Sequence, residues 1–378
     1  MRILFVLSGN SCESGSGASP GISAGVSAGA DAGSGGSAGS TTSDSAGVSA
    51  RDSASADTGS GASPGSSAGL CAGASTGDSP RAAVLPVKNP VHQAATLREL
   101  GHEVDLFFIK GRGLTGYLAA VPGIRRKIKD GRYDIIHAHY SLTAFAVSLA
   151  CTRRMVVSLA GSDVMGSSLL LPLTRLFCRA RWKKVIVKTE GMRTRLKCGD
   201  ITVVPNGVDM QLFSPGKKGE ARLALGLPDK KIVLFAADPS RAEKNFPLAE
   251  EAVRLMGRDD AMLLPVHGVP HDRMPLYYNA SDVLILTSLW EGSVNSVKEA
   301  MACNLPVVST DVGDVRINTT GLEGYYITAP DAAAMAEKLN KAMDLKVPVK
   351  GRDRMIELQL DSASVARRLI EIYNSVNS

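Results

Sequence analysis

Short apolar runs alternate with helix-like stretches along most of the chain. The runs have the length of single strands, and most are continuously apolar. Strands of this kind are buried on both faces, which is typical of parallel sheets covered by helices. The pattern therefore predicts an α/β fold with Rossmann-like units. We expect strands at residues 3–7, 103–109, 133–137, 155–159, 184–188, 201–204, 231–236, 261–266, 282–287 and 305–309.

The predicted strands fall into two sets, with a boundary near residues 198–214. A chain of 378 residues is too long for one ordinary hydrophobic core and suits two domains. We assign residues 1–200 to an N-terminal Rossmann-like domain and residues 201–361 to a C-terminal one. The helix-like segment 362–378 is expected to pack back on the N-terminal domain.

Residues 11–80 break this pattern because they are almost entirely Gly, Ala and Ser. So few apolar residues cannot offset the entropy of ordering the segment, and we interpret it as a disordered insertion. A silk-like stack of the small residues is the less favoured alternative. The segment follows the first strand directly, which places it in the first βα loop of the N-terminal domain.

The remaining composition points to a cytoplasmic protein. No run of 18 or more apolar residues occurs, so we expect no membrane-spanning helix. The apolar stretch Ile3–Leu7 is too short for a signal peptide. The six cysteines contain no C-x-x-C pair, so we expect reduced thiols and no metal site.

The net charge of +6 is unevenly distributed, because residues 11–80 hold six acidic residues and one basic residue. The strongly basic remainder suits anionic partners such as nucleotide diphosphates, lipid phosphates or nucleic acid. Aromatic residues make up only 5%, which argues against single-stranded nucleic acid, and we expect no nucleic-acid partner. We interpret the basic runs at 125–129 and 179–184 as solvated helix faces. Peripheral contact with the inner face of a membrane is the alternative.

The densest chemical signal lies at residues 289–302, where a predicted strand turns into a helix. Backbone N–H groups and the positive end of the helix suit phosphates or hydroxyl-rich anions there. Glu291 and Glu299 can each accept hydrogen bonds from sugar hydroxyls. From the residues alone, an equally weighted alternative is a capping box formed by Ser296 and Glu299.

Residues 291–303, Glu-Gly-Ser-Val-Asn-Ser-Val-Lys-Glu-Ala-Met-Ala-Cys, resemble the E-x7-E signature of retaining glycosyltransferases of family four, the glycosyl transferases group 1. The resemblance covers residues 1–10 and nearly everything from residue 86 onward. It implies the GT-B fold, in which two Rossmann-like domains face each other across a cleft. Further segments agree with the family in the same order: 134–140, 161–164, 204–209 and 275–283.

The resemblance implies roles for the residues of this motif. Glu299 would bind the ribose of the donor nucleotide. Glu291 would bind the donor hexose and take part in catalysis. Backbone N–H groups would meet the sugar or the diphosphate at three successive positions, Ser293, Val294 and Asn295.

A phosphate clamp is expected in residues 237–245, the loop after the first strand of the C-terminal domain. In the family, an Arg and a Lys of this loop hold the diphosphate in place of a metal, as a charge clamp can. Lys244 matches the Lys. Pro239 stands where the Arg usually lies, so Arg241 is a displaced substitute, with a solvated loop charge as the alternative. We expect no metal and no cofactor.

Three further residues are expected around the sugar and the acceptor. His139 follows the predicted strand 133–137, and the resemblance makes it a catalytic residue in contact with the donor sugar or the acceptor. His137 is the alternative. Gly9, at the end of the first strand, is placed on the acceptor side. Asp163 either lines the acceptor pocket or caps a helix, and the two interpretations carry equal weight.

Together these observations predict an enzyme that moves a hexose-type sugar from a nucleotide sugar to a hydroxyl of a glycan or lipid-linked acceptor. The expected setting is the synthesis of a cell-surface glycan or glycolipid. A sugar-nucleotide epimerase of the same fold and a non-catalytic sugar-nucleotide or glycan-binding protein are the alternatives. A dinucleotide oxidoreductase is disfavoured, because residues 8–11 lack the G-x-G-x-x-G pattern.

Overall fold

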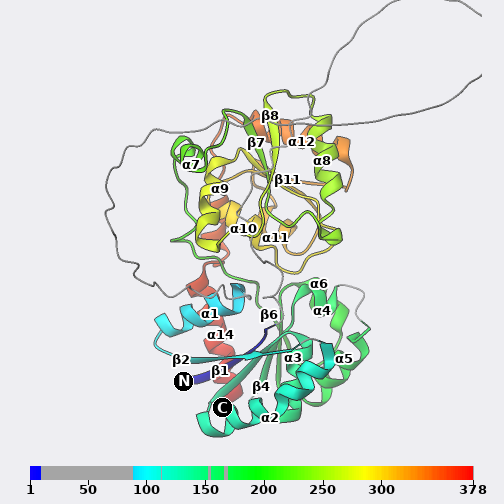
Figure 1. Cartoon of the computed structure of the whole chain (residues 1–378), viewed down its shortest axis with the longest axis vertical. Helices are drawn as coiled ribbons and strands as arrows, with labels where there is room; N and C mark the ends of the chain where they lie inside the picture. Colours follow the sequence, from blue (N-terminus) through cyan, green and yellow to red (C-terminus); the bar gives the residue numbers. More distant parts are fainter. Residues whose placement is uncertain (10–87, 112, 152–154, 166–168, 378) are drawn as a thin grey trace, which may run out of the picture. The chain divides into compact units, whose positions relative to one another are not determined.

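The computed structural model carries two parallel β-sheets with helices on their faces (Figure 1). The predicted insertion at 11–80 lies outside the residues that the structure describes. The described residues are 1–9, 88–111, 113–151, 155–165 and 169–377.

The first sheet has six parallel strands in the order β2-β1-β3-β4-β5-β6. Its strands are β1 (Arg2–Ser8), β2 (Glu103–Ile109), β3 (Ile135–His139), β4 (Met155–Ser158), β5 (Lys184–Val187) and β6 (Ile201–Val203). Its helices are α1 (Lys88–Glu99), α2 (Gly113–Gly131), α3 (Ser141–Ala150), α4 (Gly161–Val164), α5 (Leu171–Ala180) and α6 (Glu190–Leu196).

Both faces of the first sheet are buried, as the continuous apolar runs require. Leu4 and Val6 of β1 belong to a core shared with α2 and α3. Ile3 and Phe5 point to the opposite face, because successive side chains of a strand alternate between the two faces. That second core is shared with α1 and with the C-terminal helix α14 (Ser362–Asn377), which lies beside α1 in Figure 1.

The second sheet has five parallel strands in the order β11-β10-β9-β7-β8, with α8 and α12 on one face and α9, α10 and α13 on the other. Its strands are β7 (Lys231–Phe235), β8 (Ala261–Pro265), β9 (Val283–Leu286), β10 (Val307–Thr310) and β11 (Tyr325–Thr328). Its helices are α7 (Lys218–Leu225), α8 (Phe246–Leu255), α9 (Met274–Ala280), α10 (Asn295–Ala302), α11 (Val315–Thr319), α12 (Ala332–Met343) and α13 (Gly351–Glu357), with short 3₁₀ turns η1 (Ala242–Lys244) and η2 (His271–Arg273).

The backbone passes twice between the two sheets, and the two passages are hydrogen-bonded to each other. The N–H of Val208 donates to the carbonyl of Leu360, and the N–H of Ser362 donates to the carbonyl of Val208, each at 2.9 Å. Gly207 is required at this crossing, because a Cβ there would lie 2.9 Å from the Cα of Ser362.

The structure confirms the predicted α/β class with two Rossmann-like parallel sheets. Each predicted strand is present with its ends shifted by at most two residues. One shift matters for the site, because β3 extends to His139. The division expected at residue 201 is too early, since β6 pairs with β5 and the change of sheet comes after Val203. The edge strand β11 was not predicted, because only Tyr325 of its four residues is buried.

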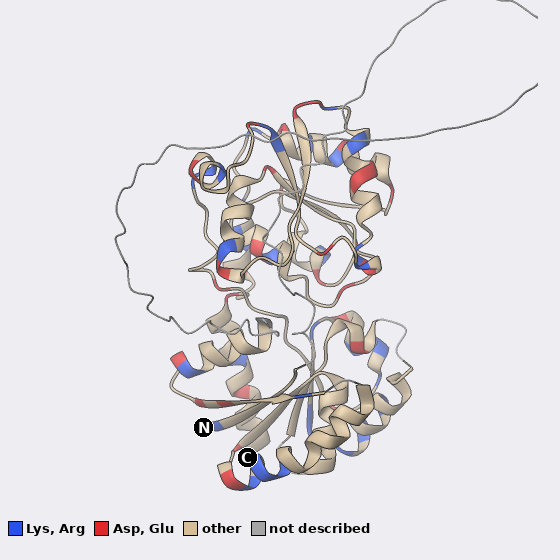
Figure 2. Ribbon diagram, in the orientation of Figure 1, with Lys and Arg blue, Asp and Glu red and all other residues tan. Residues whose placement is uncertain are grey.

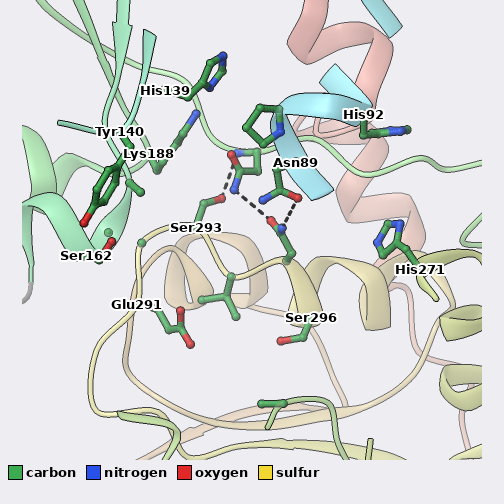
Figure 3. Close-up of a pocket in the computed structure, with 18 of the residues that line it drawn as sticks. Asn89, His92, His139, Tyr140, Ser162, Lys188, His271, Glu291, Ser293 and Ser296 are labelled. Carbon is green, nitrogen blue, oxygen red and sulfur yellow. Dashed lines mark hydrogen bonds between the residues drawn. The ribbon is translucent and has the colours of Figure 1, made fainter. Parts of the chain in front are cut away.

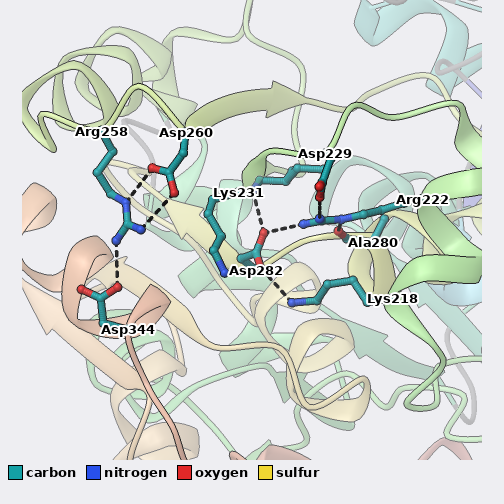
Figure 4. A network of polar contacts seen from close by, with 10 residues as sticks. Lys218, Arg222, Asp229, Lys231, Arg258, Asp260, Ala280, Asp282 and Asp344 are labelled. Atoms are coloured by element: carbon teal, nitrogen blue, oxygen red, sulfur yellow. Dashed lines mark hydrogen bonds and ion pairs between the residues drawn. The ribbon is translucent and has the colours of Figure 1, made fainter.

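A polar network joins α7 to the second sheet (Figure 4). Its centre is Asp282, directly before β9, whose side chain is only 6% exposed. The carboxylate accepts hydrogen bonds from Arg222 Nη2 at 2.7 Å, from Lys218 Nζ at 2.8 Å and from the N–H of Ile232 at 2.7 Å. This buried charge is therefore satisfied by both ionic and backbone partners.

Basic and acidic positions are interspersed over the helices of both sheets (Figure 2). Within the run 179–184, three side chains donate to carbonyls at or just after the C-terminal ends of helices, where positive charge is favourable. These pairs are Arg179 with Lys197, Arg181 with Ser148 and Lys183 with Val376. In the part of the chain that the structure describes, no helix is both long and apolar enough to cross a membrane.

Candidate active site

The carboxyl ends of strands from both sheets line a pocket of about 1010 Å³ (Figure 3). In open parallel sheets, loops at this edge are the usual place for ligands. The first sheet contributes the end of β1 and the loops after β3, β4 and β5. The second sheet contributes the loops after β7, β8 and β9 together with the start of α10.

Glu299 lies in the middle of α10, and its carboxylate faces the pocket from a nearly buried position, with 8% exposure. The hydroxyl of Tyr278 donates to Glu299 Oε2 at 2.7 Å, and Nε2 of His271 lies 3.0 Å from Oε1. Two side chains thus fix the orientation of the carboxylate. The capping-box alternative is wrong, because the N-cap of α10 is Val294, which forms no side-chain capping hydrogen bond, and the carboxylate of Glu299 is bound by Tyr278 and His271.

Glu291 precedes α10 and forms an ion pair with Lys244, the lysine of the predicted phosphate clamp. Lys244 Nζ lies 2.5 Å from Glu291 Oε1, and the hydroxyl of Ser288 donates to the same oxygen at 2.9 Å. Both partners of the ion pair are largely buried and line the pocket. The fold therefore brings Lys244 from η1 and Glu291 from the loop after β9 to one place.

Arg241 lines the pocket with Lys244, since both come from the loop after β7. Its guanidinium is mostly exposed and pairs with Glu243, two residues further along the chain. The structure therefore places Arg241 within reach of a pocket ligand, with a local carboxylate as its present partner.

The loop before α10 is tightly packed at Gly292. A Cβ on Gly161, the first residue of α4, would lie 2.6 Å from the nitrogen of Gly292. On the other side, a Cβ on Gly313 would lie 2.3 Å from the carbonyl oxygen of Gly292. Three glycine backbones are thus in direct contact, and a side chain at any of them would displace the loop.

The polar groups of the next residues are partly used within the protein. The N–H of Val294 donates to Asp314 Oδ1 at 2.8 Å, and the hydroxyl of Ser293 donates to Asp314 Oδ2 at 2.8 Å. The side chain of Asn295 bonds to Asn206 and Asn89 (Figure 3). Although all three residues line the pocket, the N–H of Val294 is already engaged, contrary to the expectation that it is open to the donor.

A buried ion pair between Lys298 and Asp314 stabilises this loop. Lys298 is fully buried, and its Nζ lies 2.8 Å from Asp314 Oδ2 and donates to the carbonyl of Asn206 at 3.0 Å. Burial alone would raise the pKa of Asp314. The charge and hydrogen bond of Lys298, with bonds from Val294 and Ser293, instead hold this pKa below its usual value. This pair was not predicted from the sequence, where the available signal was a lysine within the apolar face of α10.

The two histidines of β3 have different surroundings. His137 Nδ1 lies 2.7 Å from the hydroxyl of Tyr373, and Nε2 lies 2.8 Å from the hydroxyl of Ser158, so both ring nitrogens are engaged in the core. His139 lines the pocket and packs against the tilted ring of His137, with ring centres 4.1 Å apart. Its buried Nε2 has no partner in the described part of the chain. Burial, with the neighbouring His137 and the charge of Lys188, lowers the pKa of His139 well below its usual value.

Asp163 and Gly9 do not line the pocket. The carboxylate of Asp163 accepts from the hydroxyl of Ser141 at 2.7 Å and from the N–H of Ala160 at 2.7 Å, so it caps local turns. Burial raises the pKa of Asp163 to about 6. Gly9 donates its N–H to Ile109 and leaves no room for a Cβ beside that carbonyl. The geometry thus favours the capping interpretation of Asp163 and a packing role for Gly9.

The parallel sheets, the pocket at their carboxyl ends and the two carboxylates around α10 are the features of a GT-B glycosyltransferase. Residues 235–344 match the family described as Glycosyl transferases group 1, and residues 93–212 match Glycosyltransferase Family 4. The two matches together span more than half of the chain. The protein belongs to the family 4 glycosyltransferases and is an enzyme of that family.

Relatives with curated names are distant in sequence, and the two described here each align with 66% of this chain. TuaC of Bacillus subtilis, named for teichuronic acid biosynthesis, is 27% identical over 66% of this chain and 72% of TuaC. A galactosyltransferase of Escherichia coli, named for UDP-galactose and an N-acetylglucosamine-diphosphoundecaprenol acceptor, is 26% identical over 66% of this chain and 77% of its own length.

Solved structures share the fold at lower identity. Sucrose-phosphate synthase of Thermosynechococcus elongatus superimposes with a TM-score of 0.64 and 18% identity, over 75% of this chain and 92% of the synthase. The Anabaena protein HepE in complex with UDP and glucose has a TM-score of 0.58 and 18% identity, over 74% of this chain and 89% of HepE. These neighbours confirm the GT-B fold.

Proposed function

We propose that this enzyme is a retaining hexosyltransferase that moves a sugar from a nucleotide sugar to an acceptor hydroxyl. The observation that carries the proposal is the pair of carboxylates, Glu291 and Glu299, held by separate partners in one pocket. A carboxylate aligned by a tyrosine hydroxyl and a histidine ring, as Glu299 is, suits the vicinal hydroxyls of a ribose. A carboxylate beside a lysine, as Glu291 is, suits a sugar hydroxyl next to a phosphate.

In the proposed reaction, the bond between the anomeric carbon and the diphosphate oxygen breaks, and its electron pair stays on the diphosphate. Lys244 and Arg241 stabilise that growing negative charge. The acceptor oxygen bonds to the anomeric carbon on the same face, and its proton passes to the departing diphosphate. His139 contacts the sugar or the acceptor from the opposite wall, and the start of α10 at Ser293, Val294 and Asn295 faces the donor.

The acceptor is proposed to be a glycan or a lipid-linked sugar in the synthesis of a cell-surface polymer, as the names of the relatives suggest. We assign acceptor binding to the first sheet with α14 and donor binding to the second sheet.

A cytoplasmic location with peripheral contact to an anionic membrane is part of the proposal. The exposed Arg126 and Lys129 of α2 are the candidates for that contact, which co-sedimentation with phosphatidylglycerol vesicles would detect.

Substitution of the carboxylate and the lysine tests the donor site. We expect Glu299→Ala and Lys244→Ala each to weaken the binding of UDP-glucose, or of whichever nucleotide sugar the wild type binds, by roughly tenfold or more. Isothermal titration measures the affinity, and transfer of labelled sugar to an acceptor fraction measures turnover. The matched control is Glu250→Ala, an exposed carboxylate of α8 outside the pocket. Unchanged affinity in both folded variants would refute the assignment.

A further inference from the structure

The wall of the pocket that belongs to the first sheet carries three polar side chains without partners. Lys188 follows β5, His139 ends β3, and Tyr140 follows His139. Figure 3 shows these three on one side of the pocket with Ser162. Among the described residues, no hydrogen bond or ion pair joins the side chain of Lys188 or Tyr140, and Nε2 of His139 is buried without a partner.

Lys188 differs from the neighbouring cations in this respect. Lys244 is paired with Glu291, and Lys298 with Asp314, whereas Lys188 has no carboxylate partner in the described chain. Burial, and then the charge of Lys298, lowers the pKa of Lys188 to about 8. An unpaired, partly buried ammonium is unfavourable in an empty pocket, and an anion placed beside it would relieve that cost.

The two neighbours can donate hydrogen bonds without adding charge. Burial keeps the imidazole of His139 neutral, so its Nε2 can carry a proton toward a ligand. Burial, with the charge of Asp163, raises the pKa of Tyr140, so its phenol stays protonated. The backbone of Tyr140 has φ 84° and ψ 145°, a conformation that only glycine adopts easily, and such strain is concentrated at functional sites.

We propose that Lys188, His139 and Tyr140 form a subsite for a carboxylate or phosphate carried by the substrate, separate from the nucleotide diphosphate. Lys188 supplies the charge, and the imidazole and the phenol supply neutral donors. The inference rests on the proposed transfer reaction, since it places a second negative charge on one of its two sugars. Lys244 and Arg241, on the loop after β7, remain for the diphosphate.

The anionic group belongs either to the transferred sugar or to the acceptor. Titration with an acidic ligand and with its neutral counterpart distinguishes these two sources. If it belongs to the transferred sugar, UDP-glucuronic acid binds about tenfold more tightly than UDP-glucose. If it belongs to the acceptor, the protein saturated with UDP binds glucose 1-phosphate and not glucose. In either case Lys188→Met abolishes the difference and Lys188→Arg retains it, while the affinity for UDP stays unchanged.

Two results would overturn the subsite. One is that the wild-type protein distinguishes neither acidic ligand from its neutral counterpart. The other is that Lys188→Met weakens UDP as strongly as the acidic ligands, which would assign Lys188 to the diphosphate.

Acetylation of lysines, mapped by mass spectrometry, needs no nucleotide. It therefore tests the anion subsite independently of the proposed transfer reaction. Glucuronate or inorganic phosphate should slow the acetylation of Lys188 severalfold, while glucose should not. The exposed Lys346 is the control, and its rate should not change. If UDP sugars fail to bind but Lys188 is protected, the donor assignment fails and the anion subsite stands. Equal labelling of Lys188 with all three ligands contradicts the subsite.

Discussion

Lys188 and Lys298 show how one residue type acquires opposite roles from its partners. Lys298 is completely buried, yet its charge is balanced by Asp314 and by hydrogen bonds within the protein. Lys188 is less buried and has no such balance, so its pKa is lowered to about 8. A satisfied lysine supports a loop, whereas an unsatisfied one is available to a ligand at some cost to the free protein.

We expect Lys188→Met to raise the stability of the protein at neutral pH by roughly 1–3 kcal/mol. The pKa of Lys188 is lower in the folded state than in the unfolded chain. Between about pH 8 and the unfolded value near 10.4, the unfolded chain therefore holds a proton that the folded state has lost. The free-energy cost of the buried ammonium of Lys188 is fully present below pH 8 and disappears as the pH rises toward 10.4.

Thermal melting of the wild type and of Lys188→Met at pH 7 and pH 10 checks this sign. The melting temperature of Lys188→Met should exceed that of the wild type by more at pH 7 than at pH 10. An equal gain at both values would show that the effect comes from packing and not from the charge of the lysine.

At the scale of elements, the donor loop depends on a helix that comes after it in the chain. Asp314, immediately before α11, receives the N–H of Val294, the hydroxyl of Ser293 and the ammonium of Lys298. The loop before α10 is thus held by one carboxylate at its backbone, at its side chain and at the helix behind it.

Asp314→Asn should destabilise the protein by about 3 kcal/mol, because it leaves the buried ammonium of Lys298 without a counter-charge. Donor affinity should fall as well, since the loop loses its anchor. The double variant Asp314→Asn with Lys298→Met should recover part of the stability but not the affinity. Melting curves and UDP-sugar titration, combined as a double-mutant cycle, measure both effects. Additive losses of stability would contradict the coupling.

The packing of α7 makes a second prediction at this scale. Asp282→Ala removes the carboxylate that receives Arg222, Lys218 and the N–H of Ile232. We expect a loss of about 3 kcal/mol, because the buried N–H of Ile232 loses its acceptor and the guanidinium of Arg222 loses its buried counter-charge. Chemical denaturation measures it. The control is Asp229→Ala, a fully exposed partner of Arg222, which should change stability by less than about 0.5 kcal/mol. Equal effects of the two variants would refute the role of Asp282.

The elements could be predicted because their signals are local. A strand buried on both faces is an apolar run, and the turn from β9 into α10 is visible from composition. Partnerships are not local. That the N–H of Val294 is taken by Asp314, or that Asp163 is taken by Ser141, depends on residues about twenty positions away. For the same reason Lys188 and Tyr140 were missed, since neither shows by itself that it lacks a partner.

For the whole molecule, the pocket supplies its own cation for the departing diphosphate. Lys244 reaches the pocket from the second sheet, so we expect sugar transfer to persist after EDTA treatment and dialysis. Release of UDP, measured with and without added manganese, tests this expectation. Complete loss of activity that manganese restores would show that the diphosphate is held by a metal and that Lys244 has another role.

The return of α14 to the first sheet has a consequence for the order in which the protein matures on the ribosome. Leu369 and Tyr373 are completely buried against strands made more than two hundred residues earlier. α1 covers the rest of that face, but the part that α14 covers stays open to solvent until the whole second sheet has been synthesised. The half of the enzyme that is translated first should be the last to complete its core. During that interval the nascent chain exposes an apolar surface that chaperones recognise.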